Sequence, residues 1–368
     1  MISKAPFLAA ALGCASGFTV CATAEAEPQR ALVLEADHGE PVVGLDHPDV
    51  LASDNRAGFE TGQVVKLDGI YHMFVNEMFI RPHRDLRISY WTSPDAVDWK
   101  RHATLVESVP RRSPTNPRSE VWVTGVEFNE DEDAWNIFYV AYRGGDEAKG
   151  EIARSDYAGR IWRAKSVIPG KRGIAGPYAD MGIVLEPDEN SQEWEGQQAV
   201  ATFNPYRVGD EWYAFFDGHN HVPLGPWPVG LAKAPRLAGP WVRLPEGVNP
   251  IPIAEEFLEN PQVTELEDGG YLAVFDSFGD QEISYSESDD GIEWTPETRI
   301  RIQAQDALWA AAGDHAMRTP LCVIEEPDGT FTVLYTAKVT EEIAAEAGDE
   351  DGDFYALGKA SLVWQQAR

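Results

Sequence analysis

Glutamates recur at one position relative to several strand-like segments of this 368-residue chain. Glu60, Glu195 and Glu259 each stand four residues before the first apolar residue of such a segment. At the same place in a further segment the chain has Trp122, with Glu120 two residues earlier on the same strand face. If the segments lie side by side, their carboxylates crowd together. Crowding raises the pKa of at least one carboxyl group, which can then donate a proton at neutral pH.

Basic, aromatic and imidazole side chains near these positions could bind a polar substrate. Arg318 and other arginines could neutralise the acids or bind a negatively charged sugar, and Trp122 is equally consistent with a sugar-stacking platform or a core residue. His219 and His221 have the i, i+2 spacing of metal ligands, but no third ligand is evident, which favours hydrogen bonding to substrate and no metal site. The candidate substrate-binding residues are Trp122, His83, Arg84, Arg143, Asp217, His219, His221, Glu259, His315 and Arg318.

The charge balance bears on the partners of the protein. The chain has 61 acidic against 30 lysine and arginine residues, and the acids are scattered through predicted turns. Such a surface repels nucleic acid and anionic membranes, so neither is an expected partner.

The first residues have the pattern of an export signal. Lys4 precedes an apolar stretch, and the small-x-small pattern at residues 22–24 is typical of a signal peptidase site. We expect a signal peptide over 1–24 and an exported protein, periplasmic or secreted; the lipobox-like "ALGC" ending at Cys14 leaves lipoprotein anchoring open. No other stretch is apolar enough to span a membrane. After cleavage only Cys322 remains, which excludes an internal disulfide and a cysteine-based metal site.

Five segments read as β-hairpins, because strand-like alternation is interrupted by turn residues such as Asp-Gly. They cover residues 62–77, 124–142, 198–218, 261–277 and 318–337. A third strand is predicted after each, at 87–93, 150–156, 229–235, 282–288 and 355–361, followed by a tryptophan that would open a fourth strand and pack on the neighbouring unit. These tryptophans are Trp99, Trp162, Trp241, Trp294 and Trp364.

Five units of four antiparallel strands predict an all-β fold, a five-bladed β-propeller in one domain over residues 25–368. Almost no chain follows Trp364, so we expect residues 31–36 to supply the last strand of the final blade. Long connections follow the second strands, at 76–85, 142–150, 217–228 and 337–353. Long loops gathered on one face of a rigid scaffold usually carry function.

The recurring "YHMFVNE…RISYWTSPDAVDW" pattern resembles the five-bladed propeller glycoside hydrolases around families 43, 32, 68, 117 and 130, over essentially the whole chain after the leader. In families 43 and 32 the first three blades supply the catalytic carboxylates. The resemblance therefore implies Glu60 as base or nucleophile, Glu120 as the carboxylate that orients and tunes, and Glu195 as general acid. The first two are aspartates in those families, so this chain departs from the pattern. The resemblance implies no cofactor, although it allows an axial Ca²⁺.

These patterns predict an exported glycoside hydrolase acting on an oligo- or polysaccharide, with an algal or anionic sugar as one option. The separation of the two carboxyl groups would decide between retention and inversion. Two alternatives stay open at this point: a sugar-binding propeller without activity, and an enzyme similar to mannoside phosphorylases.

Overall fold

The computed structural model describes residues 30–80, 84–109, 113–152, 154, 156–254, 257–276, 282–303, 309–313, 316–346 and 354–366. The predicted signal peptide, His83 and His315 lie outside these residues, as does the side chain of Arg84. None of the helices in the described part is long and apolar enough to cross a membrane.

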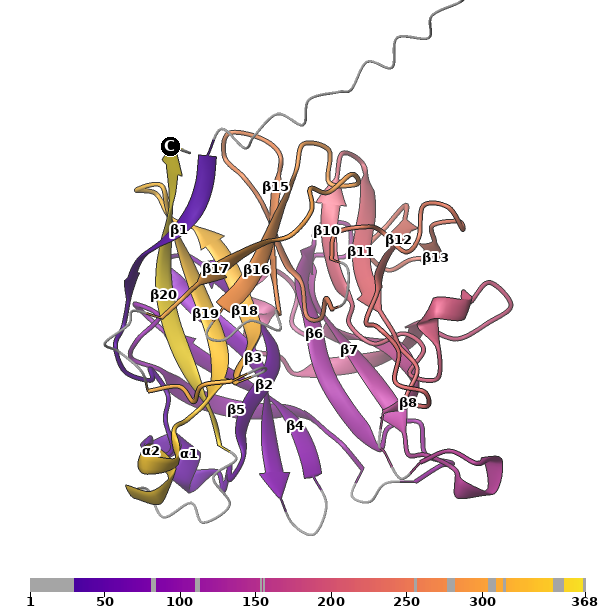
Figure 1. The fold of residues 1–368 in the computed structure, drawn as a ribbon, viewed down its shortest axis with the longest axis horizontal. Helices are drawn as coiled ribbons and strands as arrows, with labels where there is room; N and C mark the ends of the chain where they lie inside the picture. The colour runs from indigo at the N-terminus through magenta and orange to yellow at the C-terminus, as the bar shows by residue number, and fades with distance from the viewer. Residues whose placement is uncertain are drawn as a thin grey trace, which may run out of the picture.

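The fold is all-β, as predicted, and its strands form three four-stranded sheets and one eight-stranded sheet (Figure 1). The eight-stranded sheet can be divided into two groups of four strands, so the strands are named below as units 1 to 5. Unit 1 contains β2 (Gly58–Leu67), β3 (Ile70–Ile80), β4 (Arg84–Ser93) and β5 (Lys100–Glu107); unit 2 contains β6 (Glu120–Asn129), β7 (Ala134–Arg143), β8 (Tyr157–Ser166) and β9 (Tyr178–Leu185). Unit 3 contains β10 (Asn204–Val208), β11 (Glu211–Asp217), β12 (Val229–Ala234) and β13 (Val242–Arg243); unit 4 contains β14 (Gln262–Glu265), β15 (Tyr271–Phe275), β16 (Glu282–Ser288) and β17 (Thr298–Arg301). Unit 5 contains β18 (Met317–Glu325), β19 (Thr330–Lys338), β20 (Tyr355–Gln366) and β1 (Arg30–Asp37).

Short helices occupy some of the connections between strands. They are α1 (Pro48–Ala52), α2 (Glu341–Glu346) and the 3₁₀ turns η1 (Glu147–Lys149), η2 (Lys171–Ala175) and η3 (Glu193–Glu195). Units 1 and 5 join into one eight-stranded sheet, because Gly58 of β2 bridges Tyr355 of β20 in parallel.

The first hairpin shows how the turn chemistry fixes register. Asp68 and Gly69 have φ values of 51° and 81°, the left-handed pair that a two-residue hairpin turn requires. Leu67 consequently pairs with Ile70, and the pairing continues along β2 and β3 to Gly62 and Val75.

The two ends of the described chain pair in one sheet. β1 runs antiparallel to β20, with Leu32 opposite Trp364, and Figure 1 shows the indigo and yellow strands side by side. Leu32 is 1% exposed, and the Arg30 guanidinium lies 4.2 Å from the centre of the Trp364 ring. The predicted pairing of residues 31–36 with the last strand is confirmed.

The first strands of the five units contact one another in a closed cycle: β2 with β6, β6 with β10, β10 with β14, β14 with β18, and β18 with β2. Amide side chains bridge them. Asn76 donates to the Val121 carbonyl at 2.7 Å and accepts from the Val123 amide at 2.7 Å. Gln262 donates to the Gly62 carbonyl at 3.3 Å. These bonds satisfy backbone groups that have no ladder partner between units.

Glycine permits the closest of these approaches. A Cβ on Gly125 of β6 would lie 2.6 Å from Pro205 Cδ and 3.0 Å from the Phe203 carbonyl oxygen, both in the unit 3 segment. A larger residue at this position would therefore force units 2 and 3 apart.

The tryptophans partly follow the prediction. Trp99, Trp241 and Trp294 precede the fourth strands of their units, and Trp294 packs on Phe215 of unit 3 with ring centres 5.1 Å apart. Trp162 and Trp364 instead lie within third strands, β8 and β20.

The predicted third strand at 150–156 is wrong. That segment carries alternating charged groups at Glu151, Arg154 and Asp156 and forms no strand where it is described. The alternately buried residues of β8, immediately after it, form the strand instead.

Cys322 is buried in β18, 3% exposed, where burial raises the pKa of its thiol to about 12. This environment fits the expectation of an unreactive packing residue.

Leu32→Ala tests the contribution of β1. Removing this buried side chain is expected to lower the free energy of unfolding by about 2–5 kcal/mol, because it leaves a cavity between β1 and β20. Urea denaturation followed by tryptophan fluorescence measures the change. Leu51→Ala is the matched control, since Leu51 is 57% exposed, and equal stability of both variants would contradict the closing role of β1.

Candidate active site

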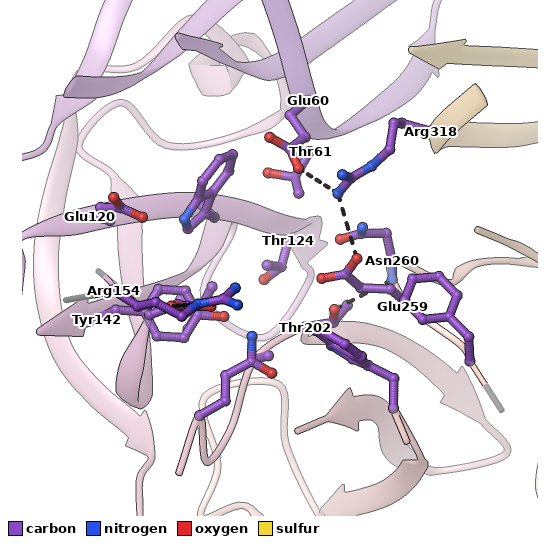
Figure 2. A pocket seen from close by; sticks show the side chains of 17 residues that line it. Glu60, Thr61, Glu120, Thr124, Tyr142, Arg154, Thr202, Glu259, Asn260 and Arg318 are labelled. Atoms are coloured by element: carbon purple, nitrogen blue, oxygen red, sulfur yellow. Dashed lines mark hydrogen bonds and ion pairs between the residues drawn. The ribbon is translucent and has the colours of Figure 1, made fainter. Parts of the chain in front are cut away.

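A cavity of about 560 Å³ opens where the first strands begin. Its volume lies in the range of small-molecule sites, roughly 300–1,000 Å³. Figure 2 shows that its side chains come from several units and point toward one another. The lining residues are Glu60, Thr61, Glu120, Trp122, Thr124, Val140, Tyr142, Arg154, Asp156, Gln198, Ala201, Thr202, Trp227, Phe257, Glu259, Asn260 and Arg318.

Glu60 is positioned by an irregularity in β2. The pairing of β2 with β3 shifts register between Phe59 and Gly62, so Glu60 and Thr61 lie in a bulge. Bulges re-aim side chains and are common beside active sites. The bulge directs Glu60 into the cavity, where its side chain is 13% exposed.

Arg318 connects carboxylates from different units. Its Nη2 donates to Glu60 Oε1 at 2.6 Å and lies 3.7 Å from Glu259 Oε2, and both contacts are drawn in Figure 2. Its Nε lies 4.0 Å from Asp276 Oδ2. Although burial works against the charge of the guanidinium, Glu60, Glu259 and Asp276 raise the pKa of Arg318, so it stays cationic.

The acids around Arg318 differ in their environments. The side chain of Glu259 is 20% exposed and lines the cavity. Burial raises its pKa well above the ordinary range, and the charges of Asp217, Asp276 and Glu60 add to this rise while Arg318 opposes it. Burial likewise raises the pKa values of Asp217 and Asp276. Glu60 Oε1 accepts the short hydrogen bond from Arg318 Nη2, at 2.6 Å.

A threonine or asparagine recurs at or just before the first strand of every unit, and each of these residues is buried. Four of the five, all except Thr319, line the cavity. The hydroxyl of Thr202 donates to Asp217 Oδ2 at 2.7 Å, and Asn260 Nδ2 donates to Asp276 Oδ2 at 3.3 Å. The members of this set are Thr61, Thr124, Thr202, Asn260 and Thr319.

The position preceding this set holds different residues in different units. Glu60, Glu259 and Arg318 stand there in units 1, 4 and 5, and these are the three residues joined by the ion pairs. Units 2 and 3 have Val123 and Ala201 there. Each threonine or asparagine of the set and the residue before it form a pair, and comparing these five pairs in the sequence would have revealed the equivalent positions. Counting back from the first apolar residue of each strand did not reveal them in every unit.

Glu195 is the main correction to the predicted site. It ends η3, is 1% exposed, and does not line the cavity. Arg243 Nε donates to its Oε1 at 2.7 Å and Arg243 Nη2 to its Oε2 at 2.9 Å, while the backbone N–H of Gln192 donates to Oε1 at 2.9 Å. With both oxygens engaged in a bidentate ion pair, the residue fits a structural role.

Glu120 and Trp122 of β6 line the cavity, and Figure 2 shows Glu120 at its edge. Glu120 is 3% exposed, and Tyr142 of the adjacent β7 lines the cavity beside it. Burial and the surrounding carboxylates raise the pKa of Tyr142 well above its ordinary value, so its hydroxyl stays protonated and can donate a hydrogen bond.

Four of the predicted binding residues that the structure describes do not line the cavity. Arg143 does not line the cavity, because its guanidinium forms a bidentate pair with Glu151, at 2.5 and 2.8 Å. Asp217, His219 and His221 are buried behind the wall, with Asp217 bonded to Thr202. Prediction from sequence missed Asp276 and the lining residues Arg154 and Asp156.

An axial calcium ion does not fit the residues that the structure brings together. Calcium binds six to eight oxygen ligands. Here the guanidinium of Arg318 lies among the carboxylates of Glu60, Glu259 and Asp276 and already supplies the positive charge. We therefore assign calcium no part in the chemistry of these residues.

Comparison with known proteins agrees with this architecture. No family model matches the sequence, and no curated protein matches it. Among solved structures, the chain is similar to Zg3597, a family 117 glycoside hydrolase produced by the marine bacterium Zobellia galactanivorans. The TM-score is 0.59 at 12% identity, over 90% of both chains.

Two α-L-arabinofuranosidases are also similar in structure. The enzyme from Lactobacillus brevis has a TM-score of 0.53 at 12% identity, over 84% of this chain and 93% of its own. PaAbf62A from Podospora anserina, solved in complex with cellotriose, has a TM-score of 0.50 at 14% identity, over 88% and 95%. At these identities the likeness shows the fold, which is shared with propeller glycoside hydrolases and confirms the resemblance seen in the sequence.

Glu259→Gln tests the protonation of this carboxyl group through stability. Above the ordinary carboxyl pKa of about 4.3, the unfolded chain releases a proton that folded Glu259 retains. The wild-type protein therefore loses stability as pH rises from that value through the raised pKa of Glu259, and the glutamine variant lacks this contribution. We expect the Tm difference between variant and wild type to shift in favour of the variant between about pH 4.5 and pH 8, measured by calorimetry.

The exposed Glu246→Gln is the control, and its Tm difference from wild type should not change with pH in this way. Parallel Tm profiles of wild type and Glu259→Gln would mean that Glu259 is ionised throughout.

Proposed function

We propose that this protein is an exported glycoside hydrolase built as a five-bladed β-propeller, with the cavity at the centre as its active site. The five four-stranded units and the closed cycle of their first strands support the blade count. The propeller glycoside hydrolases that share the fold support the reaction class.

The observation that carries the proposal is the pair Glu60 and Glu259, which lie at one cavity in contrasting environments. Glycoside hydrolysis needs one carboxyl group that is protonated and one that is ionised. Burial raises the pKa of Glu259, which favours the protonated form, and the Arg318 guanidinium donates a hydrogen bond to Glu60 at 2.6 Å. Pairs of acids whose environments drive their pKa values apart mark this division of labour.

In the proposed reaction, Glu259 donates its proton to the glycosidic oxygen as the bond to the leaving group breaks. Glu60 either attacks the anomeric carbon or deprotonates the water that does so, while positive charge develops on the sugar ring. Glu120 keeps the orienting role that the resemblance implied, beside Trp122, which offers an aromatic face for a sugar ring. Glu259 replaces Glu195 as the acid.

The cavity does not favour the phosphate-dependent alternative. Among its lining residues Glu60, Glu120, Asp156 and Glu259 outnumber Arg154 and Arg318. Arg318 is engaged by carboxylates, and Arg154 forms two hydrogen bonds to Asp156 at 3.1 and 3.0 Å. A phosphate anion would meet a net negative site.

Glu60→Gln and Glu259→Gln test the two roles separately. Each is expected to lower kcat on unactivated oligosaccharides by about 100-fold or more, the usual size of general acid–base contributions. An aryl glycoside with a good leaving group needs no acid assistance, so Glu259→Gln should recover much of its activity on that substrate while Glu60→Gln should not. Release of reducing ends from a panel of plant and algal oligosaccharides identifies the natural substrate class, and NMR of the products gives the stereochemistry.

Glu195→Gln distinguishes the earlier assignment from this one. We expect it to reduce stability through the weakened Arg243 pair, without selective recovery on the aryl glycoside. Recovery with Glu195→Gln but not with Glu259→Gln would overturn the proposal. Glycan binding by the wild-type protein without release of reducing ends would instead support a sugar-binding propeller.

A further inference from the structure

His219, His221 and Asp156 come together behind one wall of the cavity, from the connections after β7 and β11. One ring nitrogen of each histidine and one carboxylate oxygen of Asp156 lie within 4.8 Å of one another. The sequence showed the two histidines but no third ligand, because Asp156 precedes His219 by 63 positions in the chain and lies in another unit.

His219 has one ring nitrogen whose lone pair accepts no hydrogen bond within the described residues. The side chain is 0% exposed, and its Nδ1 lies 2.8 Å from Gln198 Oε1, an acceptor, so Nδ1 carries the proton. Nε2 is therefore unprotonated, and it is buried without a hydrogen-bond partner. A buried acceptor that lacks a donor lowers the folding stability of a protein, unless a ligand binds to that acceptor.

His221 has the same arrangement with its nitrogens exchanged. It is 5% exposed, and its Nε2 donates to the backbone carbonyl of Asp156 at 3.0 Å, so the lone pair is on Nδ1, which is also buried without a partner. The Nε2 atom lies 3.7 Å from Asp156 Oδ1. The two rings are 4.6 Å apart between centres and nearly perpendicular, at 84°.

Each imidazole has one ring nitrogen engaged by a hydrogen-bond acceptor and one buried nitrogen without a hydrogen-bond partner, which is the arrangement that metal ligation requires. Hydrogen bonds from the second nitrogen of a histidine, such as that from His219 to Gln198, fix the tautomer and ring orientation of metal ligands. Trp227 stacks on the face of His219 at 3.4 Å between ring centres and leaves the ring edge, where a metal binds, uncovered by that contact.

We propose that Asp156, His219 and His221 form a binding site for a divalent transition-metal ion of the Zn²⁺ class. Two imidazoles and one carboxylate, with a fourth position open to water, are a common zinc ligand set. Bond lengths of about 2.1 Å place such ligand atoms about 3.4 Å apart, so small side-chain movements from the present spacing suffice. Coordination by His221 Nδ1 would keep its bond to the Asp156 carbonyl, whereas coordination by Nε2 would replace it.

Arg154 is the group that competes with the metal for Asp156. Its guanidinium donates to both carboxylate oxygens, and its side chain is 42% exposed, so it can turn toward the cavity when a cation binds. A bound ion would join the connection after β7 to the connection after β11. Because Asp156, Arg154 and Trp227 line the cavity, this crosslink would fix one wall of the substrate site.

Calorimetric titration of the full-length, metal-stripped protein with Zn²⁺ tests the site, using a preparation without a polyhistidine tag. We expect about one equivalent to bind, and Co²⁺ in its place to give the visible absorption of a four-coordinate ion with nitrogen and oxygen ligands. Asp156→Asn and His219→Gln should each weaken Zn²⁺ binding at least tenfold. Asp156→Asn changes a partly exposed carboxylate, so it tests the site even if His219→Gln folds poorly, and circular dichroism checks both.

His102→Gln is the matched control, because His102 is exposed on β5 and should leave Zn²⁺ affinity unchanged. Cys14 and Cys21 are present in every variant, so ions held by the leader appear equally in all titrations. Binding that is absent in the wild type, that is unchanged in Asp156→Asn and His219→Gln, or that is seen with Ca²⁺ but not Zn²⁺ would overturn the proposal. The titration contains no sugar, so its result is independent of whether the protein is a glycosidase.

Discussion

The close approach of five first strands is the constraint on which the rest of the structure depends. β2, β6, β10, β14 and β18 come from distant parts of the chain, yet they contact one another in a closed cycle. Strands of separate sheets cannot complete each other's hydrogen-bond ladders at such a junction. Amide side chains therefore bond to backbone groups of other units: Asn76 of unit 1 bonds to unit 2, and Gln262 of unit 4 bonds to Gly62 of unit 1. Gly125 leaves room for the segment around Pro205.

This junction brings charged side chains from different units into contact. Glu60, Glu259 and Arg318 each precede the buried threonine or asparagine of their units. They come from three different units and line the same cavity. One guanidinium cannot neutralise all the carboxyl groups around it, and burial penalises every remaining negative charge. Burial consequently raises the pKa values of Glu259, Asp217 and Asp276.

The wall of the cavity is built differently from its floor. The floor uses threonine and asparagine residues at or just before the first strands, whereas the wall uses connections that differ from unit to unit. Asp156 and Trp227 belong to such connections and line the cavity, and the buried His219 lies beside both. Loops on a rigid scaffold can vary without disturbing the core, so the specificity of the protein is expected to lie in this wall.

The sequence by itself determined the strands, most of the turns and the pairing of the chain ends. Alternation and turn residues such as Asp68-Gly69 act locally, and β1 pairs with β20 as expected. The sequence also singled out Glu60, Glu120, Glu259 and Arg318, which line the cavity. Only the tertiary structure decided which acids meet, because the bulge at Glu60 depends on its pairing with β3 and Glu195 is held by Arg243 of β13. The same holds for Asp156 and the two histidines, since no local pattern records the distance between side chains on different connections.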